Sequence, residues 1–345
     1  MGELPTSPAA QQGVEFPGAE CIGHGRPVSH PGPVPRPLQS MELDRPRTLR
    51  WCRPRHRPLA NLNAMSSPEE VQLQADAIAW FHTIDLGNGV VTKGHSTSVI
   101  PEALFPPIAG CSVLDIGAWD GYYSFMAERL GASRVVALDH YAWGVDIGAR
   151  EAYWTECAAN GTLPDQSRDL TDFWRSELPG RRGFEFASAT LGSKVEPRLG
   201  DFATTDLTEL GSFDVVLYLG VLYHMKEPLT CLERLRSVTS GVAVIETQAV
   251  HLQHYEEGKL IQFYGAGELN HDFGNWYIPT MDGLHSLCRA AGFSSVRTIQ
   301  GPPPPSAPEP ESIRTRLGRR LAHIARPDQT SAPSAFYRAI VHASA

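Results

Sequence analysis

Several features that would place this chain of 345 residues in a special class are missing. No apolar run approaches the about 20 residues that a membrane helix needs, and the first residues lack the basic-then-apolar pattern of a signal peptide. The six cysteines form no CxxC pair or metal-ligand spacing, which predicts free thiols rather than a disulfide framework. The chain also lacks the excess of basic residues typical of dedicated nucleic-acid binders, because its formal net charge is −8. We therefore expect a cytoplasmic protein without a membrane span.

Residues 1–64 contain no lysine and no helical or strand period, and they are rich in proline, glycine and arginine. Such a segment buries too little apolar surface to offset the entropy of ordering, so we predict that it is disordered. Two interpretations stay open: translation starts at Met65, or the segment is an Arg-rich targeting arm. Residues 65–345 are predicted to form one domain, with insertions at about 140–190 and 248–279.

Local patterns predict the elements of that domain. Ser66 or Ser67 can cap a helix that continues through Phe81, and Asn88-Gly89 marks a tight turn. Further helices are predicted at Ile147 to Ala159, Pro228 to about Val238 and Met281 to Ala291. Strands are predicted in KVEPRLGDF (ending at Asp201), FDVVLYLGVLYH, GVAVIET (ending at Glu246), SSVRTI and FYRAIVHA.

The stretch VLDIGAWDGYYSF carries the strongest functional signal. An apolar run ends in Asp115, glycines follow at 117 and 121, and a helical pattern leads to a second apolar run, VVAL, which Asp139 closes. This order predicts a strand, a tight turn, a helix, a second strand and an acid. Open α/β sheets bind nucleosides with elements in this order.

Details of this motif favour S-adenosylmethionine (SAM) over a dinucleotide. Gly117 and Gly121 lack a Cβ and permit close approach of a ligand to the backbone. Trp119 stands where many such turns have a glycine, and it crowds the position of a pyrophosphate. A nicotinamide-dependent dehydrogenase is therefore the least favoured alternative.

Five acidic and aromatic positions have predicted roles in cofactor binding. Asp115 faces the cationic amino group, and Asp139 accepts hydrogen bonds from the ribose. His140 follows Asp139 and lines the adenosine. Asp201 takes the adenine amino group, and Phe202 or a neighbour flanks the ring.

Methyl transfer from a sulfonium is an in-line displacement, which needs alignment and sometimes a base. Candidates lie after strands, because ligands bind at the carboxyl ends of open α/β sheets. Tyr223 and His224 lie at the carboxyl end of one predicted strand, and Glu246 ends another. His224 is a general base or a structural histidine, and Glu246 is a second base or a loop anchor.

Aromatic residues gather in the two insertions, and aromatic faces favour a flat or unsaturated acceptor. Tyr141 and Trp143 lie in the first, and Trp276 lies in the second beside Asn275, which could orient the acceptor or the amino-acid end of SAM. The run from His251 to Glu257 fits no metal-ligand spacing, and we predict no metal.

The motifs together resemble class I SAM-dependent methyltransferases. They are WFHTIDLGNGVVTKG, VLDIGAWDGYYSF, VVALDHYAW, FDVVLYLGVLYHMKEPL, VIET and NWYIPT. The chain looks most like the branch with the bacterial tRNA wobble-uridine (5-oxyacetic acid) methyltransferase and actinobacterial relatives of specialised metabolism. The resemblance implies that Leu219 and Gly220 lie near the methyl group. It also implies a role for Lys93, which matches a lysine that helps the tRNA-modifying member bind a carboxylated SAM.

The sequence thus predicts an α/β, Rossmann-like fold with a seven-stranded, mostly parallel sheet, helices on both faces and two lid insertions. The predicted function is O- or C-methylation of a small aromatic, phenolic or unsaturated metabolite. Two alternatives remain, tRNA wobble-uridine modification and a non-catalytic SAM-binding protein. A homodimer also stays open.

Overall fold

The computed structural model describes residues 67–96, 98–165, 167–168, 171–175, 179–252, 258–265, 267–270, 272, 274–303 and 334–345. The predictions for residues 1–64, and those for His254, Glu256 and Glu257, lie outside these residues.

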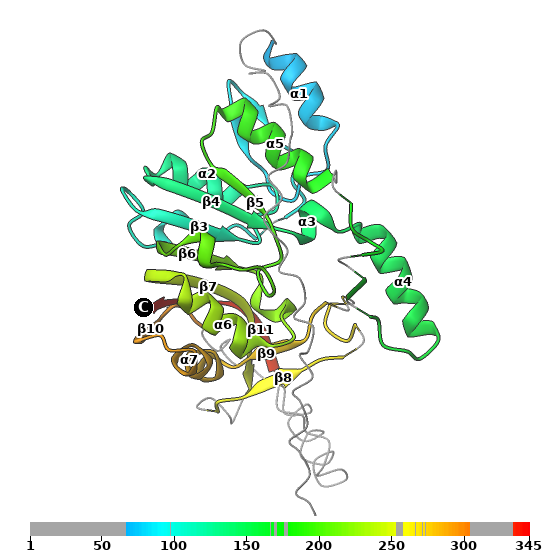
Figure 1. Cartoon of the computed structure of the whole chain (residues 1–345), viewed down its shortest axis with the longest axis vertical. Coiled ribbons are helices and arrows are strands. Elements are labelled where there is room, and N and C mark those ends of the chain that lie inside the picture. The colour runs from blue at the N-terminus through cyan, green and yellow to red at the C-terminus, as the bar shows by residue number, and fades with distance from the viewer. Residues whose placement is uncertain are drawn as a thin grey trace, which may run out of the picture. The chain divides into compact units, whose positions relative to one another are not determined.

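Seven of the described strands form one sheet in the order β10-β11-β7-β6-β3-β4-β5 (Figure 1). Strands β5, β4, β3, β6 and β7 run parallel, and β11 is antiparallel to both of its neighbours. The predicted seven-stranded, mostly parallel sheet is confirmed. The strands are β3 (Ser112–Ile116), β4 (Arg134–Asp139), β5 (Glu196–Leu199), β6 (Phe213–Leu219), β7 (Thr239–Leu252), β10 (Ser295–Gln300) and β11 (Ser334–Ser344).

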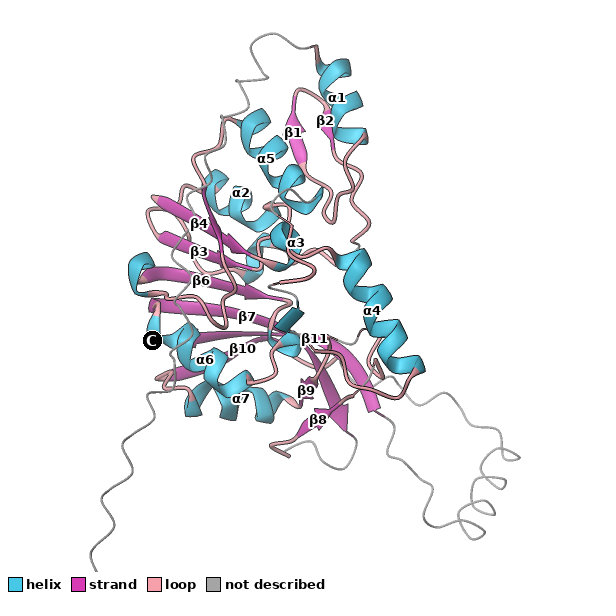
Figure 2. Cartoon of the chain, turned by 45° about the vertical axis from the view of Figure 1, so that its right-hand side comes forward, coloured by secondary structure: helices cyan, strands magenta, loops and turns pink. Residues whose placement is uncertain are grey.

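Helices cover both faces of this sheet (Figure 2). One face packs with α2 and α5 around residues such as Val135 and Leu217. The other packs with α6 and α7 around residues such as Leu138 and Val216. The helices are α1 (Pro68–Asp76), α2 (Tyr122–Arg129), α3 (Tyr141–Gly144), α4 (Ile147–Ala159), α5 (Pro179–Leu191), α6 (Pro228–Ser237) and α7 (Met281–Ala290), with short 3-10 turns η2 (Glu102–Leu104), η4 (Thr208–Leu210) and η5 (Leu222–His224).

Two small antiparallel pairs complete the described elements. Strands β1 (Asp85–Gly87) and β2 (Val90–Val91) are joined at Asn88 and Gly89, which both have positive φ. Positive φ at both central positions is what a tight hairpin turn needs, so the predicted turn is confirmed. Strands β8 (Ile261–Phe263) and β9 (Tyr277–Pro279) pair within the second predicted insertion.

Most predicted helices are confirmed. Helix α4 has the predicted bounds, with Asp146 as its N-cap and Asn160 after its end. Ser67 caps α1 in a capping box with Glu70. The first insertion, however, also contains α5, which was not predicted from the sequence.

Four predicted boundaries are wrong. Strand β6 ends at Leu219, and Leu222–His224 form the 3-10 turn η5, so the strand does not run through His224. Helix α1 ends at Asp76 and does not reach Phe81, because the N–H of Phe81 donates to Asp120 instead of to a helical carbonyl. Strand β5 ends at Leu199, two residues before Asp201. Strand β7 continues to Leu252 rather than ending at Glu246, because β11 pairs with it along its whole length.

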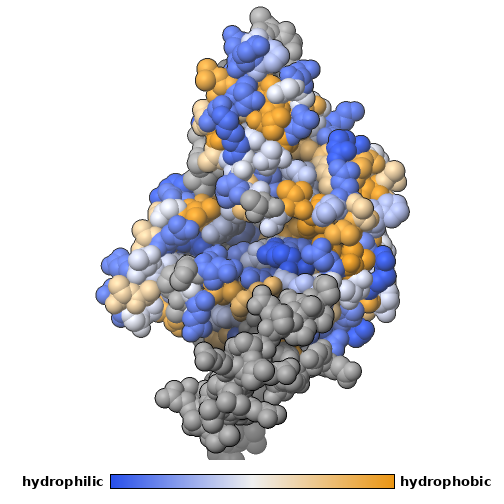
Figure 3. Space-filling model, turned by 180° about the vertical axis from the view of Figure 1, so that it is seen from behind, coloured by the Kyte–Doolittle hydropathy of each residue, from blue (hydrophilic) through white to orange (hydrophobic). Residues whose placement is uncertain are grey.

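Hydrophobic and hydrophilic residues are mixed on the face seen in Figure 3, with orange atoms near the top, where α1 and β2 lie. Exposed apolar side chains of these elements include Leu73 and Val91. Among the described residues, no helix combines the length and apolar character needed to span a bilayer.

Candidate functional site

A tight turn joins β3 to α2 at the carboxyl end of the sheet, and we call residues 115–121 the cofactor turn. The N–H groups of Gly117 and Ala118 donate to the carbonyl of Leu138 at 2.8 and 3.3 Å, which ties the turn to the end of β4. Gly117 and Gly121 have φ of 78° and 86°. A Cβ at Gly121 would lie 2.6 Å from the rings of Phe125 and Phe184, so only glycine fits there.

Trp119 adopts φ of 50°, the left-handed region that costs a residue with a side chain about 1–2 kcal/mol. Contacts on both sides of its peptide hold it there. Its N–H donates to Asp139 Oδ2 at 2.9 Å, and its carbonyl accepts from Trp143 Nε1 at 2.5 Å. Trp143 is buried against Phe184, so the structure gives it a supporting position behind the turn.

Asp115 is buried at the end of β3 and accepts a hydrogen bond from Ser124 Oγ at 2.6 Å. Burial raises the pKa of Asp115 to about 6, although the hydrogen bond from Ser124 opposes the shift. The carboxyl group is therefore mainly ionised at neutral pH, as a partner of an ammonium group must be.

Asp139 ends β4 with one backbone donor on each carboxylate oxygen. Oδ2 accepts from the N–H of Trp119, and Oδ1 accepts from the N–H of Ala142, both at 2.9 Å. Burial raises the pKa of Asp139, while these donors oppose the shift. An ionised carboxylate offers about four acceptor positions, so Asp139 keeps capacity to accept a hydrogen bond from a ribose hydroxyl. This donor and acceptor arrangement fits the adenosyl part of SAM.

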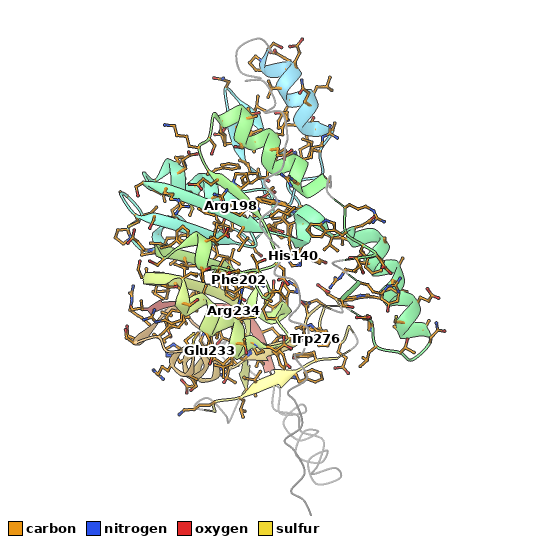
Figure 4. All side chains as sticks on the ribbon, in the orientation of Figure 1. His140, Arg198, Phe202, Glu233, Arg234 and Trp276 are labelled. Atoms are coloured by element: carbon orange, nitrogen blue, oxygen red, sulfur yellow. The ribbon has the colours of Figure 1, made fainter. Side chains whose placement is uncertain are left out.

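The residues predicted to border the adenine follow the ends of β4 and β5. Figure 4 labels two of them, His140 and Phe202. His140 Nδ1 is 3.8 Å from Asp201 Oδ1. Asp201 also accepts from the N–H of Ala203 and the hydroxyl of Thr204, both at 2.9 Å. The ring of Phe202 is buried against Tyr218, with a centroid separation of 5.5 Å. Of the two options for flanking adenine, this placement favours a neighbour of Phe202.

A second cluster lies at the ends of β6 and β7, next to the cofactor turn. A Cβ on Gly117 would meet Val221 Cγ2 at 2.8 Å, so the loop after β6 touches the turn directly. Leu219 is paired with Glu246 across β6 and β7, and the N–H of Gly220 donates to the carbonyl of Glu246 at 3.1 Å. Although β7 continues, Glu246 thus stands level with the end of β6.

Glu246 forms a two-pronged ion pair with Arg338 of β11. Arg338 Nη2 lies 2.5 Å from Glu246 Oε2, and Arg338 Nε donates to Oε1. Arg338 Nη1 also donates to Tyr223 Oη at 3.4 Å. Burial raises the pKa values of Glu246 and Tyr223 despite this cation. The Tyr223 phenol therefore stays protonated near neutral pH and acts as a hydrogen-bonding group rather than a base.

His224 lies beside this cluster, with its ring 4.3 Å from that of Tyr223. Its Nδ1 is 3.1 Å from the carbonyl oxygen of Gly274. Burial lowers the pKa of His224, which favours the neutral ring. Because Nδ1 must donate to that carbonyl, the other nitrogen, Nε2, carries the free lone pair and can accept a proton.

The second insertion reaches this cluster through its backbone, because the N–H of Trp276 donates to the carbonyl of Tyr223 at 2.8 Å. Neighbouring Asn275 is buried and donates through Nδ2 to the carbonyl of Leu269 at 3.1 Å. Tyr141 of α3 lies near the cofactor turn, with its ring centroid 6.3 Å from that of Trp119.

Lys93 is not brought to these clusters by any contact described. Its side chain is 73% exposed, and Nζ lies 2.6 Å from Asp76 Oδ2 of α1. A surface cavity of about 640 Å³ lies elsewhere, along α4 beside Tyr153 and Arg168, and no predicted site residue lines it.

Two arginines of the site were not predicted from the sequence. Arg338 interrupts the apolar strand pattern FYRAIVHA, a signal that could have identified it. Arg150 of α4 donates to Tyr141 Oη at 3.2 Å and lies over the Trp154 ring at 3.5 Å. Nothing in the local pattern of α4 singles out Arg150, because helices commonly carry exposed arginines.

Comparisons with known proteins agree with this geometry. A family model described as a methyltransferase domain matches residues 92–298. The tRNA U34 carboxymethyltransferase of Pseudomonas putida (strain W619) is 27% identical over 196 residues, which are 56% of this chain and 48% of that protein. The same enzyme of Serratia proteamaculans (strain 568) is 25% identical over 218 residues, 61% of this chain and 54% of that protein. The chain thus spans about half the length of the curated relatives it matches.

A solved structure shares the fold. The N-terminal domain of EvdMO1, solved with S-adenosylhomocysteine (SAH) bound, has a TM-score of 0.51 and 17% sequence identity. The match covers 81% of this chain and 98% of that one.

Proposed function

We propose a substrate class for this chain, which belongs to the methyltransferase-domain family and uses SAM as its cofactor. It transfers the methyl group to oxygen or carbon of a small aromatic, phenolic or unsaturated acceptor. The observation that carries the proposal is the adjacency of two groups of residues: the cofactor turn with Asp139, and the loop that holds Tyr223 and His224.

Cofactor binding follows from the turn. Gly117, with φ of 78°, permits the turn, Asp115 faces the amino group of the methionine part, and Asp139 accepts from the ribose. His140 and Asp201, which lie 3.8 Å apart, border the adenine. SAM supplies an activated methyl group on a sulfonium sulfur, and its departure leaves a neutral thioether.

His224 acts as the general base of the proposed reaction. Its Nδ1 is committed to the Gly274 carbonyl, and its lowered pKa keeps Nε2 free to take the proton of the acceptor O–H or C–H. Tyr223, whose phenol stays protonated, orients the acceptor by donating a hydrogen bond. Glu246 is occupied by Arg338 and serves as an anchor of this loop.

The two insertions form the acceptor side of the site in this proposal. The first contributes Tyr141, and the second contributes Asn275 and Trp276, which the hydrogen bond from Trp276 to Tyr223 fixes beside the loop. Aromatic faces suit a flat acceptor because ring stacking buries its surface.

The test is a screen of phenolic and unsaturated acceptors with SAH release as the readout. His224→Asn should lower kcat by about 10²–10⁴-fold, the usual contribution of a general base. The asparagine amide still donates to Gly274, so the affinity for SAM should stay unchanged. No SAH release with any acceptor, from protein that binds SAM, would favour the non-catalytic alternative. An unchanged kcat in the variant would remove His224 as the base.

The second candidate is carboxymethyl transfer to the wobble uridine of tRNA. The names of the curated relatives support it, because they are tRNA U34 carboxymethyltransferases. Its test is the nucleoside composition of tRNA from a deletion strain, which should lose a modified uridine. In that case Lys93→Met should abolish the use of carboxylated SAM, whereas small-molecule methylation predicts no effect because Lys93 pairs with Asp76 at the surface.

A further inference from the structure

Residues 80–96, which we call the front segment, fold back on themselves beside the cofactor turn. Trp80 bridges to Gly94, and Thr92 Oγ1 donates to the carbonyl of His82 at 2.9 Å. The two arms pack so closely that a Cβ on Gly94 would lie 2.1 Å from the carbonyl carbon of His82.

One carboxylate fastens the front segment to the cofactor turn. Asp120 is 1% exposed, and its Oδ2 accepts from the N–H groups of Phe81 at 3.0 Å and His82 at 2.7 Å. Its Oδ1 lies 2.6 Å from His82 Nδ1. His82 is 7% exposed, and its ring stacks on that of Tyr122 with a centroid separation of 5.1 Å. We call the three contacts between Asp120 and residues 81–82 the clasp.

The clasp sets the position of an aromatic pair. The Phe81 ring stacks on Trp119 with a centroid separation of 4.6 Å and an interplanar angle of 30°. The His95 ring stands edge-on to Phe81 at 5.0 Å. Trp119 is also the residue whose N–H binds Asp139. The stacked rings therefore stand next to the carboxylate that receives the ribose in the proposed function.

We propose that Asp120 and His82 are positioning residues for cofactor binding, which hold the Phe81–Trp119 stack as an aromatic wall beside the sulfonium end of SAM. The inference rests on the proposed function. Two neighbouring residues of the cofactor turn make these contacts. The N–H of Trp119 donates to Asp139, and the carboxylate of Asp120 accepts from the front segment. Without the clasp, two backbone donors lose their acceptor and Phe81 loses its fixed place. An aromatic face attracts a cation, so the wall favours SAM over its neutral product.

Calorimetry of the purified full chain with SAM and with SAH tests this inference. Phe81→Leu keeps every hydrogen bond of the clasp and removes only the ring. It should weaken SAM binding at least ten-fold and SAH binding less, which lowers the ratio of the two affinities. Asp120→Ala should do the same.

Two further variants separate the clasp from general destabilisation. In His82→Asn, the amide nitrogen takes the place of Nδ1, so the affinity for SAM should stay within about three-fold of wild type. In His82→Leu no donor replaces Nδ1, so the affinity for SAM should fall. His342→Asn is the matched control, because His342 is equally buried and hydrogen-bonds the Leu104 carbonyl at 2.9 Å far along β11. It should leave both affinities unchanged.

The outcomes are distinct. If Phe81→Leu binds both SAM and SAH with the same affinities as wild type, the aromatic wall is overturned. The clasp is overturned if His82→Asn loses as much affinity as His82→Leu. It is also overturned if the control variant His342→Asn loses affinity. If Asp120→Ala does not fold, Phe81→Leu and the His82 pair decide. Failure of the wild-type protein to bind SAM or SAH would instead refute the proposed function.

Discussion

Replacing Arg338 by methionine removes the cation that faces Glu246 while keeping most of the apolar stem. The Glu246 side chain is only 4% exposed, so its carboxylate would be left buried without its partner. Breaking a buried ion pair in this way costs about 3–5 kcal/mol of stability. Because the Arg338 side chain is 40% exposed, water replaces part of its interaction, and we expect about 2–3 kcal/mol.

The pH dependence of this loss follows from Glu246. Burial already raises its folded-state pKa above the ordinary value of 4.5, and the variant should raise it further. An acid with a raised folded-state pKa holds its proton more readily when folded, so stability falls as pH rises through that range. The cost of Arg338→Met should therefore shrink as pH falls toward the raised pKa of Glu246, because the carboxyl group then takes up its proton.

The chain offers a closely matched control. Arg134 is also 40% exposed and binds Glu196, but Glu196 is 36% exposed. Arg134→Met should cost about 0–1 kcal/mol, the usual value of a surface pair, with little dependence on pH. The double variant Glu246→Gln with Arg338→Met should recover at least about 1 kcal/mol of the single variant's loss.

Urea unfolding at pH 7.5 and 5.5 measures all four proteins. Equal losses for Arg338→Met and Arg134→Met at pH 7.5 would refute the reasoning from burial. A loss for Arg338→Met that is as large at pH 5.5 would show that the charge of Glu246 is not its cause.

Three further predictions concern the cofactor turn and Asp139. SAM affinity should fall up to about ten-fold per unit as pH drops below 6, the pKa of Asp115, because protonation removes the charge that faces the amino group. Calorimetry should show a flatter profile for Asp115→Asn. Gly121→Ala should cost about 1–3 kcal/mol more than Gly110→Ala in thermal unfolding, because both have positive φ but only Gly121 has rings 2.6 Å from the added Cβ. A similar loss for both would mean that α2 shifts to admit the methyl group. Asp139→Asn should weaken SAH binding at least ten-fold, since an amide has one acceptor oxygen; unchanged binding would exclude Asp139 as the ribose acid.

Much of the fold could be predicted because its signals are local. Period and capping residues gave the bounds of α4, and the alternation of apolar runs and helical patterns gave the parallel sheet. Predictions from local pattern were wrong where a residue distant in the sequence forms hydrogen bonds with the segment. Helix α1 stops at Asp76 although the pattern continues: the carbonyl of Ala75 accepts from the Trp80 indole, and Asp120 binds the backbone of Phe81 and His82.

The sequence by itself determined the sheet and the glycine turn, because strand period and positive-φ positions are properties of neighbouring residues. Only the tertiary structure decided the partners of the acids. Glu246 meets Arg338, 92 residues away, and Asp120 meets His82, 38 residues away. A buried carboxylate must find a donor or a cation wherever the packed chain provides one, and that choice depends on the assembled sheet rather than on local pattern.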